Sequence, residues 1–174
     1  VKIDYTINPT LQLAADKLLK AYKPDYGAIV LMDTESGKIL AMSSYTRGDS
    51  NADNLALRGT FPAASIFKIV TATAAMERHS MTPDTIVMYN GSNHTLYKRN
   101  VMNTNVNRWT RGISLRDAFA KSVNTVFGRI ALERLAPKDL EEYAIRFGFN
   151  KDIASDLPFD PGFTEIPQEK SFRL

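Results

Sequence analysis

One apolar segment constrains the fold of this chain more than any other feature. It begins after Pro62, runs from residue 63 to about residue 78, and contains neither glycine nor proline. No charged side chain lies between Lys68 and Glu77. A helix that is apolar on nearly every side belongs inside a core. We therefore expect residues 63–78 to form a buried helix that other elements surround.

Further helices are predicted from apolar periodicity and from capping signals. Residues 9–22 carry apolar side chains at helical spacing, with charged side chains on the opposite face. Ser114 opens a capping box at the head of another helix, and a further helical stretch follows Asn124. Pro137 takes a first-turn position in a helix that stops at Gly148. These segments predict a mostly helical lobe.

Two extended runs predict a β-hairpin near the start of the chain. Residues 27–32 and 38–43 read as extended runs, and turn residues with a glycine join them. The first run is apolar at every position after Gly27, which predicts a strand buried on both faces. A second hairpin is expected with its turn at Asn90-Gly91. Together the patterns predict a mixed α+β fold, an antiparallel sheet flanked by helices plus the helical lobe.

Composition excludes several classes of function. The 174 residues fit one domain or most of one. The 22 Lys and Arg and the 19 Asp and Glu are spread along the chain, so we expect no nucleic-acid partner. The chain has no cysteine, which excludes a disulfide scaffold, a cysteine zinc site and a thiol nucleophile. His79 and His94 are too few for a histidine metal site. The apolar stretches are far shorter than the roughly 20 residues that span a bilayer. We therefore expect any membrane anchor or export signal to lie outside this sequence.

Ser65 and Lys68 are the side chains best placed to do chemistry. Burial of an unpaired ammonium is costly. A lysine at the N-terminus of an apolar helix therefore normally has a hydrogen-bonding or charged partner, a lowered pKa or a functional role. Ser65 lies one turn earlier on the same face, near backbone N–H groups that favour developing negative charge. The pair could act as nucleophile and base. A snorkelling surface lysine is the alternative, since one Ser-x-x-Lys can arise by chance among eleven serines and eleven lysines.

A second polar motif, Ser122-Val123-Asn124, falls between two helical segments. A turn there would project a hydroxyl and an amide into a cleft, where they could relay a proton and hold a substrate amide. Capping of the following helix by Asn124 is the alternative interpretation. Trp109 precedes this motif and could line a substrate groove, although a local packing role fits it equally well.

Taken in order, these motifs resemble the transpeptidase domain of penicillin-binding proteins. Ser65-Ile66-Phe67-Lys68 follows Phe61-Pro62, and Ser122-Val123-Asn124 comes some tens of residues later. The resemblance extends over nearly all of the chain. The further matching segments are Thr6-Ile7-Asn8, Gly27-Ala28-Ile29-Val30, Gly37-Lys38-Ile39-Leu40, Gly112-Ile113-Ser114-Leu115 and Phe147-Gly148-Phe149.

The resemblance implies a serine D,D-transpeptidase of peptidoglycan synthesis that binds penicillin and needs no cofactor. Ser65 would form an acyl-enzyme with D-Ala-D-Ala stem peptides or with β-lactam antibiotics. Lys68 would accept the proton, Ser122 would pass it to the leaving group, and Asn124 would hold Lys68 and the substrate amide. Trp109 is expected as a further substrate contact.

The family resemblance also implies where such a protein works. We expect it outside the cytoplasm, at the periplasmic face of the cytoplasmic membrane, anchored by a segment that is not in this sequence. Stem peptides and β-lactams would be its ligands, and other cell-wall synthesis proteins its possible partners.

Two departures from the family pattern shape these expectations. Ala64 stands where the family usually has glycine, and the family's third motif, Lys-Thr/Ser-Gly, is absent, although Lys170-Ser171 begins similarly. We therefore expect residues 1–174 to be a partial transpeptidase domain that lacks its C-terminal strands. The sheet should then show two strands, and this fragment alone should be acylated poorly or not at all.

Two alternatives keep the same fold. A serine β-lactamase would need a glutamate that activates water for deacylation, and Glu141, Glu142 and Glu165 are the candidates, none within a recognisable pattern. A β-lactam sensor or a non-catalytic scaffold is the other alternative. The presence of Ser65, Lys68 and Asn124 argues against the scaffold.

Overall fold

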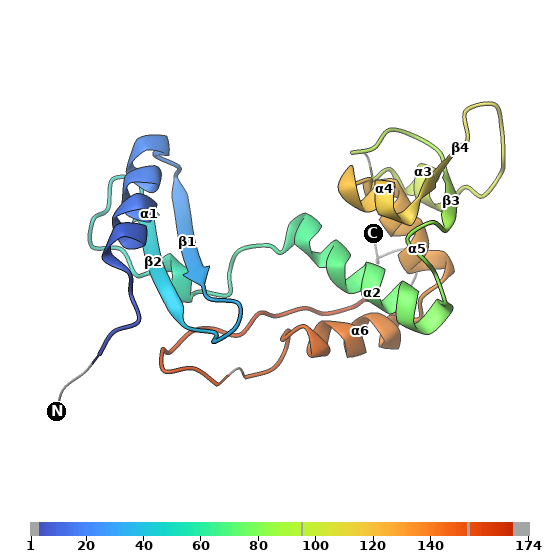
Figure 1. The fold of residues 1–174 in the computed structure, drawn as a ribbon. Coiled ribbons are helices and arrows are strands. Elements are labelled where there is room, and N and C mark those ends of the chain that lie inside the picture. Colours follow the sequence, from blue (N-terminus) through green and yellow to red (C-terminus); the bar gives the residue numbers. More distant parts are fainter. Residues whose placement is uncertain (1–3, 95, 153, 169–174) are drawn as a thin grey trace. The chain divides into compact units, whose positions relative to one another are not determined.

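The computed structural model describes residues 4–94, 96–152 and 154–168, which form two compact units (Figure 1). The first unit comprises residues 4–60 and 154–160, and the second comprises residues 61–152 and 161–168. The elements of the first unit are α1 (Pro9–Tyr22), β1 (Tyr26–Met32), β2 (Ile39–Thr46) and the 3₁₀ helix η1 (Leu55–Leu57). The elements of the second are η2 (Ala64–Phe67), α2 (Lys68–His79), β3 (Ile86–Tyr89), α3 (Lys98–Met102), β4 (Arg111–Ser114), α4 (Leu115–Ala120), α5 (Asn124–Glu133) and α6 (Pro137–Arg146).

Helix α1 has the bounds that the sequence predicts, because both ends carry strong local signals. Asn8 caps its start, where the side-chain oxygen accepts hydrogen bonds from the N–H groups of Thr10 and Leu11. Its end follows from Lys23, whose left-handed backbone (φ 46°) cannot continue the helix. Its buried side chains are Ala15 and Leu19.

Strands β1 and β2 form the predicted antiparallel hairpin. The register pairs Gly27 with Tyr45 and Leu31 with Ala41. Helix α1 is tied to β2 by side-chain hydrogen bonds: the Gln12 amide bonds the backbone N–H and C=O of Met42, and the Ser43 hydroxyl donates to the Asp16 carboxylate at 2.5 Å. The helix therefore covers the face of the sheet on which Ser43 lies.

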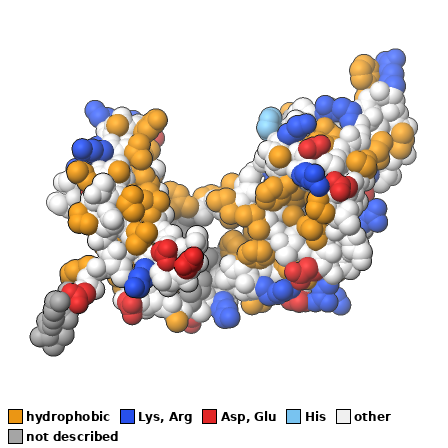
Figure 2. All heavy atoms as spheres, in the orientation of Figure 1, with side chains coloured by type: hydrophobic (Ala, Val, Ile, Leu, Met, Phe, Trp, Pro, Cys, Tyr) orange, Lys and Arg blue, Asp and Glu red, His pale blue; other side chains and the backbone are white. Residues whose placement is uncertain are grey.

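Burial of β1 on both faces, which its apolar run predicts, is wrong within the described residues. Val30, Leu31 and Met32 are exposed, and Figure 2 shows hydrophobic side chains over this strand. Among the described residues of this unit, α1 makes its hydrogen bonds to β2, and only the short η1 lies near the opposite face, where the Leu55 N–H donates to Ser44 Oγ. An apolar run is compatible with burial of a strand on both faces. Burial also requires another element to pack on each face, and the run itself does not show whether such an element is present.

The second unit has its core where α2, α5 and α6 meet. Val70, Ala74, Val126, Ile130 and Ala144 are all buried in one hydrophobic cluster. Side chains from β3 and α4 complete this cluster. The second unit is thus the helical lobe that the sequence predicts.

The apolar segment after Pro62 forms two helices rather than one. The 3₁₀ helix η2 precedes α2, and the Lys68 N–H bonds the carbonyls of Ser65 and Ile66 where the two meet. Burial on nearly all sides is also wrong for the described chain, because Ile66, Ile69 and Met76 are exposed. Helix α2 packs through one face against α5 and α6, and its other face has no comparable cover among the described elements of this unit.

The predicted tight hairpin at Asn90-Gly91 is also wrong. Strand β3 pairs antiparallel with β4, which lies about twenty residues later, and Tyr89 is opposite Arg111. Gly91 does have a left-handed backbone (φ 93°), but its turn begins a long connection that contains α3. The Asn-Gly signal is local, whereas the choice of strand partner is not.

Signals at the starts of the remaining helices are confirmed. The Ser114 hydroxyl accepts from the Asp117 N–H at 3.1 Å at the head of α4. Pro137 is the first residue of α6, and the helix ends before Gly148, whose φ is 91°. The mixed α+β class follows from these helices and the two small antiparallel sheets. No helix among the described residues is long and apolar enough to cross a membrane.

Candidate active site

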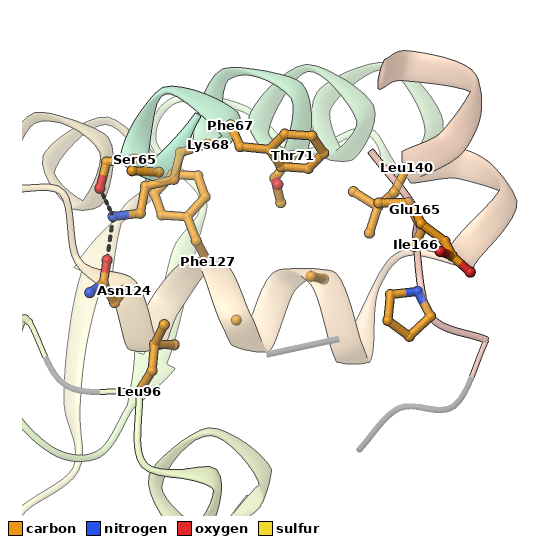
Figure 3. A pocket seen from close by; sticks show the side chains of 14 residues that line it. Ser65, Phe67, Lys68, Thr71, Leu96, Asn124, Phe127, Leu140, Glu165 and Ile166 are labelled. Atoms are coloured by element: carbon orange, nitrogen blue, oxygen red, sulfur yellow. Dashed lines mark hydrogen bonds between the residues drawn. The ribbon is translucent and has the colours of Figure 1, made fainter. Parts of the chain in front are cut away.

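Two turns of the second unit bring the four predicted catalytic residues together. Ser65 lies in η2, and Lys68 is the first residue of α2. Ser122 lies in the turn between α4 and α5, and Asn124 is the first residue of α5. Figure 3 shows the side chains of Ser65, Lys68 and Asn124 pointing toward one another.

Both turns hold a residue other than glycine in the left-handed region. Ala64 has φ 46° and Ser122 has φ 51°. This conformation costs an L-residue about 1–2 kcal/mol because Cβ approaches the backbone. The turn at Ser122 is fixed by the hydrogen bonds Ser122 N–H to the Phe119 carbonyl, at 3.0 Å, and Val123 N–H to the Ala118 carbonyl, at 2.9 Å. Backbone strain of this kind is typical of functional sites.

The Lys68 ammonium is surrounded by four oxygen atoms. Nζ lies 3.0 Å from Ser65 Oγ, 2.8 Å from Ser122 Oγ, 2.9 Å from the Ser122 carbonyl oxygen and 2.5 Å from Asn124 Oδ1. The ring of Phe127 lies 5.8 Å away, measured from Nζ to the ring centroid. Among the described residues, no carboxylate forms an ion pair with Lys68. The charged amine is therefore held by dipoles rather than by an opposite charge.

Counting donors shows how a neutral amine at Lys68 would fit this arrangement. A charged ammonium has three N–H donors, and a neutral amine has two N–H donors and one lone pair. Asn124 Oδ1 and the Ser122 carbonyl can only accept, so they take the two N–H groups of a neutral amine. The lone pair then faces the hydroxyl groups. Partial burial lowers the pKa of Lys68 below its ordinary value because desolvation penalises the charged form.

The two serines are also linked to each other. The Ser122 hydroxyl donates to Ser65 Oγ at 3.1 Å while it lies 2.8 Å from Lys68 Nζ. Ser65, Lys68 and Ser122 thus form a closed triangle of hydrogen bonds. A proton that leaves Ser65 for Lys68 can pass on to Ser122 without any large movement.

Asn124 is bonded on both sides of its amide. Its Oδ1 faces Lys68, and its Nδ2 donates to the backbone carbonyl of His94 at 3.1 Å. Its backbone N–H donates to the carbonyl of Asn93 at 2.8 Å. Sequence reasoning missed these two carbonyls, because a backbone acceptor has no residue-type signal.

A pocket of about 560 Å³ opens beside these residues. Figure 3 shows Ser65 and Lys68 at one end of it and Glu165 at the opposite end. The described residues that line the pocket are Ala64, Ser65, Phe67, Lys68, Thr71, Leu96, Asn124, Phe127, Gly128, Ala131, Leu140, Glu165, Ile166 and Pro167. All of them belong to the second unit.

Trp109 lies apart from this pocket. Its side chain is 70% exposed and does not belong to the described lining. The Arg108 guanidinium lies 4.7 Å from the centroid of its ring, and its backbone N–H donates to the Asn107 side chain at 2.8 Å. A substrate contact of Trp109 therefore stays a prediction.

The three glutamates considered for deacylation have other surroundings. Glu142 forms an ion pair with Arg78, and Glu141 accepts a hydrogen bond from Gln168. Glu165 lines the pocket at the end opposite to Ser65 (Figure 3). Among the described residues, no cluster of three or more acidic or histidine side chains could hold a metal ion. Lys170 and Ser171, which begin like the third family motif, lie outside the described residues.

Comparison with known proteins assigns the family. Residues 27–162 match the model of the penicillin binding protein transpeptidase domain, which is more than half of the chain. The chain therefore belongs to the penicillin-binding protein transpeptidase domain family.

Individual relatives are distant in sequence. The chain is 28% identical to peptidoglycan D,D-transpeptidase PbpA of Mycobacterium tuberculosis H37Rv, a match that covers 85% of this chain and 36% of that protein. It is 28% identical to penicillin-binding protein PbpB of Mycolicibacterium smegmatis, over 90% of this chain and 26% of that protein. The chain thus spans about a third or less of the length of these curated relatives.

A solved structure shares the fold. The penicillin-binding protein PonA1 from Mycobacterium tuberculosis superimposes with a TM-score of 0.63 at 24% sequence identity. The match covers 91% of this chain and 40% of that one. At this identity the likeness concerns the fold, and it agrees with the mixed α+β class predicted from the sequence.

Proposed function

We propose that this chain carries the nucleophile, the base and the proton relay of a peptidoglycan D,D-transpeptidase. The observation that carries the proposal is the contact of Lys68 Nζ with Ser65 Oγ at 3.0 Å, together with the three further oxygen acceptors around the same nitrogen. Membership of the transpeptidase family and the printed name of the relative PbpA support the same reaction.

The first step is acylation of Ser65. Neutral Lys68 takes the hydroxyl proton, and Ser65 Oγ attacks the carbonyl carbon of the penultimate D-Ala of a stem peptide. The peptide bond to the last D-Ala breaks, and an ester to Ser65 remains. The proton moves from Lys68 through the Ser122 hydroxyl, 2.8 Å away, to the leaving amine, so that free D-Ala departs with its charge balanced. An acceptor amine then attacks the ester carbonyl, the bond to Ser65 Oγ breaks, and the proton of the amine returns to Ser65, so that a new amide forms the cross-link.

Asn124 serves two partners in this scheme. Its Oδ1 holds Lys68, and one hydrogen of its Nδ2 donates to the His94 carbonyl. An amide nitrogen has two hydrogens. The second one is therefore available for a carbonyl of the substrate, the role that the family resemblance implies.

We propose further that β-lactams acylate Ser65, since they offer a strained amide to the same nucleophile. The reaction places the protein outside the cytoplasm, at the periplasmic face of the cytoplasmic membrane, because its substrate is the cell wall. In this proposal residues 1–174 are one part of a transpeptidase domain, held at the membrane by a segment outside this sequence. Substrate binding by Trp109 belongs to the same proposal and rests only on the position of Trp109 before the Ser122-Val123-Asn124 motif.

The β-lactamase alternative has less support. A hydrolase needs a base that activates water at the acyl-enzyme. Glu142 is paired with Arg78, and Glu165 lies at the far end of the pocket (Figure 3). Neither is a hydrogen-bond partner of Ser65 among the described residues.

The test is covalent labelling of the full-length protein with a fluorescent penicillin. The wild type should form a stable adduct whose mass maps to the peptide that contains Ser65. Ser65→Ala should abolish labelling, and Lys68→Met should slow it by about 10²–10⁴-fold, the usual contribution of a general base. Ser50→Ala, at an exposed serine of the first unit, is the matched control and should label normally.

Two outcomes would contradict the proposal. Undiminished labelling of Ser65→Ala would exclude Ser65 as the nucleophile. Continuous release of hydrolysed penicillin at the rate of acylation would favour the β-lactamase. Release of D-Ala from a stem peptide that ends in D-Ala-D-Ala, lost in Ser65→Ala, would identify the substrate class.

A further inference from the structure

The connection between β3 and β4 lies against the start of α5 and offers it three successive backbone carbonyls. The carbonyl of Ser92 accepts from the Thr125 hydroxyl at 3.2 Å. The carbonyl of Asn93 accepts from the Asn124 backbone N–H at 2.8 Å, and that of His94 accepts from Asn124 Nδ2 at 3.1 Å. Residues 92–94 therefore contact the candidate active site through Asn124, although none of their side chains belongs to it.

The His94 carbonyl fixes which way the Asn124 amide faces. An ammonium can only donate and a carbonyl can only accept, so the oxygen must face Lys68 and the nitrogen must face His94. If residues 92–94 moved away, the amide could rotate and present its nitrogen to Lys68. Lys68 would then lose its shortest acceptor contact, at 2.5 Å.

Residues 92–94 are in turn held by the end of β3. Tyr89 is 3% exposed, and its hydroxyl donates to Asn93 Oδ1 at 3.2 Å. Asn90 is also buried, and its Oδ1 accepts from the Thr110 hydroxyl at 2.7 Å, which ties the two ends of the long connection together. Tyr89 thus anchors the connection at Asn93, whose backbone contacts Asn124, and Asn90 anchors it at Thr110.

We propose that Tyr89 and Asn93 are positioning residues for the acylation of Ser65. They hold residues 92–94 in place, and these residues orient the Asn124 amide so that its oxygen stabilises Lys68. The inference rests on the proposed function, because acylation is the step in which Lys68 must direct its lone pair toward the Ser65 hydroxyl.

The role has a signature in the pH profile of acylation. The groups that face Lys68 are the hydroxyls of Ser65 and Ser122, the Ser122 carbonyl, the Asn124 amide and the Phe127 ring, with no carboxylate among the described residues. Loss of the Asn124 oxygen would remove an acceptor that favours the charged ammonium. The rate of acylation rises with pH as Lys68 loses its proton and then reaches a plateau. The rising part, the acidic limb, should therefore move to lower pH, and the plateau rate should fall. A loss of folded protein would lower the plateau without moving the limb.

Tyr89→Phe in the full-length protein is the sharpest test, because it removes one hydroxyl and keeps the buried ring. We expect its plateau rate of penicillin acylation to fall about two- to tenfold, the loss that one hydrogen bond of ordinary strength produces. Tyr143→Phe is the matched control. Tyr143 is 2% exposed, and its hydroxyl donates to Glu77 at 2.7 Å, away from the candidate site. Its rate and its pH limb should stay within twofold of the wild type.

Asn93→Ala tests the same contact from the other side, at a half-buried loop residue, and it keeps the test available if Tyr89→Phe folds poorly. The two changes remove one hydrogen bond, so their combined effect should be no larger than the larger single effect. Independent, multiplying effects would overturn the proposal, and so would a Tyr89→Phe profile equal to that of Tyr143→Phe. If the wild type forms no acyl-enzyme at Ser65, the proposed function fails and this inference fails with it.

Discussion

Replacement of Ala64 by glycine should stabilise the second unit, which is unusual for a glycine placed in a helical turn. Ala64 starts η2 with φ 46°, in the left-handed region, directly before Ser65. The neighbouring Ala63 has φ −63°, in the right-handed region. Two adjacent alanines thus occupy opposite backbone conformations, and a glycine should affect them with opposite sign.

The magnitude follows from two opposing effects. Relief of the left-handed strain is worth about 1–2 kcal/mol, and the greater freedom of an unfolded chain with glycine costs about 0.4–1 kcal/mol. The side chain of Ala64 is exposed, so its removal uncovers no buried surface. The middle of these ranges gives a net gain of about 0.8 kcal/mol for Ala64→Gly, and their extremes give about 0 and about 1.6 kcal/mol. Ala63→Gly relieves no strain and should cost about 0.5–1 kcal/mol.

Hydrogen exchange measures this change inside the full-length protein. Amides of α2 that exchange only when the second unit opens report its free energy of unfolding. Since 1.4 kcal/mol corresponds to a factor of ten, their exchange should slow about two- to fivefold in Ala64→Gly. The same amides should exchange about two- to fivefold faster in Ala63→Gly. Faster exchange in both variants would refute the reasoning, because Ala64 would then not be strained.

Two further predictions concern the candidate site and the connection beside it. Acylation of Ser65 should speed up as the pH rises through the pKa of Lys68, since the neutral amine is the proposed base. Burial lowers that pKa below the ordinary lysine value of 10.5, so the midpoint of the rate profile should lie below pH 10.5. Rates of penicillin labelling that fall with rising pH would contradict this. Gly91→Ala should destabilise the second unit by about 1–2 kcal/mol, because φ is 93° and the added Cβ would overlap the Asn100 side chain; an unchanged thermal midpoint would contradict it.

The elements that the sequence predicts well are those whose signals are local. Residues 9–22 repeat apolar side chains at helical spacing, and the structure has a helix with the same bounds. Ser114 and Pro137 mark helix starts through chemistry that acts within one turn. The hairpin of β1 and β2 is similar, because a few turn residues join its strands.

The predictions that failed required knowledge of distant partners. The apolar run in β1 indicates a strand fit for burial, but burial depends on elements elsewhere in the chain. The Asn90-Gly91 signal marks a left-handed glycine correctly, yet the partner of β3 is β4 on the far side of α3. Neither fact is contained in the residues that carry the signal.

The contacts of the candidate site also differ in whether a local signal in the sequence could predict them. Ser65 and Lys68 are three residues apart, so helical spacing places them on one face, where Lys68 Nζ lies 3.0 Å from Ser65 Oγ, although the spacing left a snorkelling lysine as the alternative. Asn124 lies 56 residues after Lys68, so its contact with Nζ was expected only from the resemblance to a family. The carbonyls of residues 92–94 had no signal at all, because every residue type has the same backbone acceptor.

The chemistry proposed for Lys68 depends on the direction of its lone pair more than on its distance to Ser65. Asn124 Oδ1 and the Ser122 carbonyl cannot donate, so they take both N–H groups of the neutral amine and leave its lone pair for a hydroxyl. A rotated Asn124 amide would offer a donor where an acceptor is needed, and the amine would have to turn to find another partner. A substitution that leaves Ser65 and Lys68 in contact can therefore still slow acylation. In the proposed reaction, the contacts around Asn124 therefore influence the rate of acylation as the contact between Ser65 and Lys68 does.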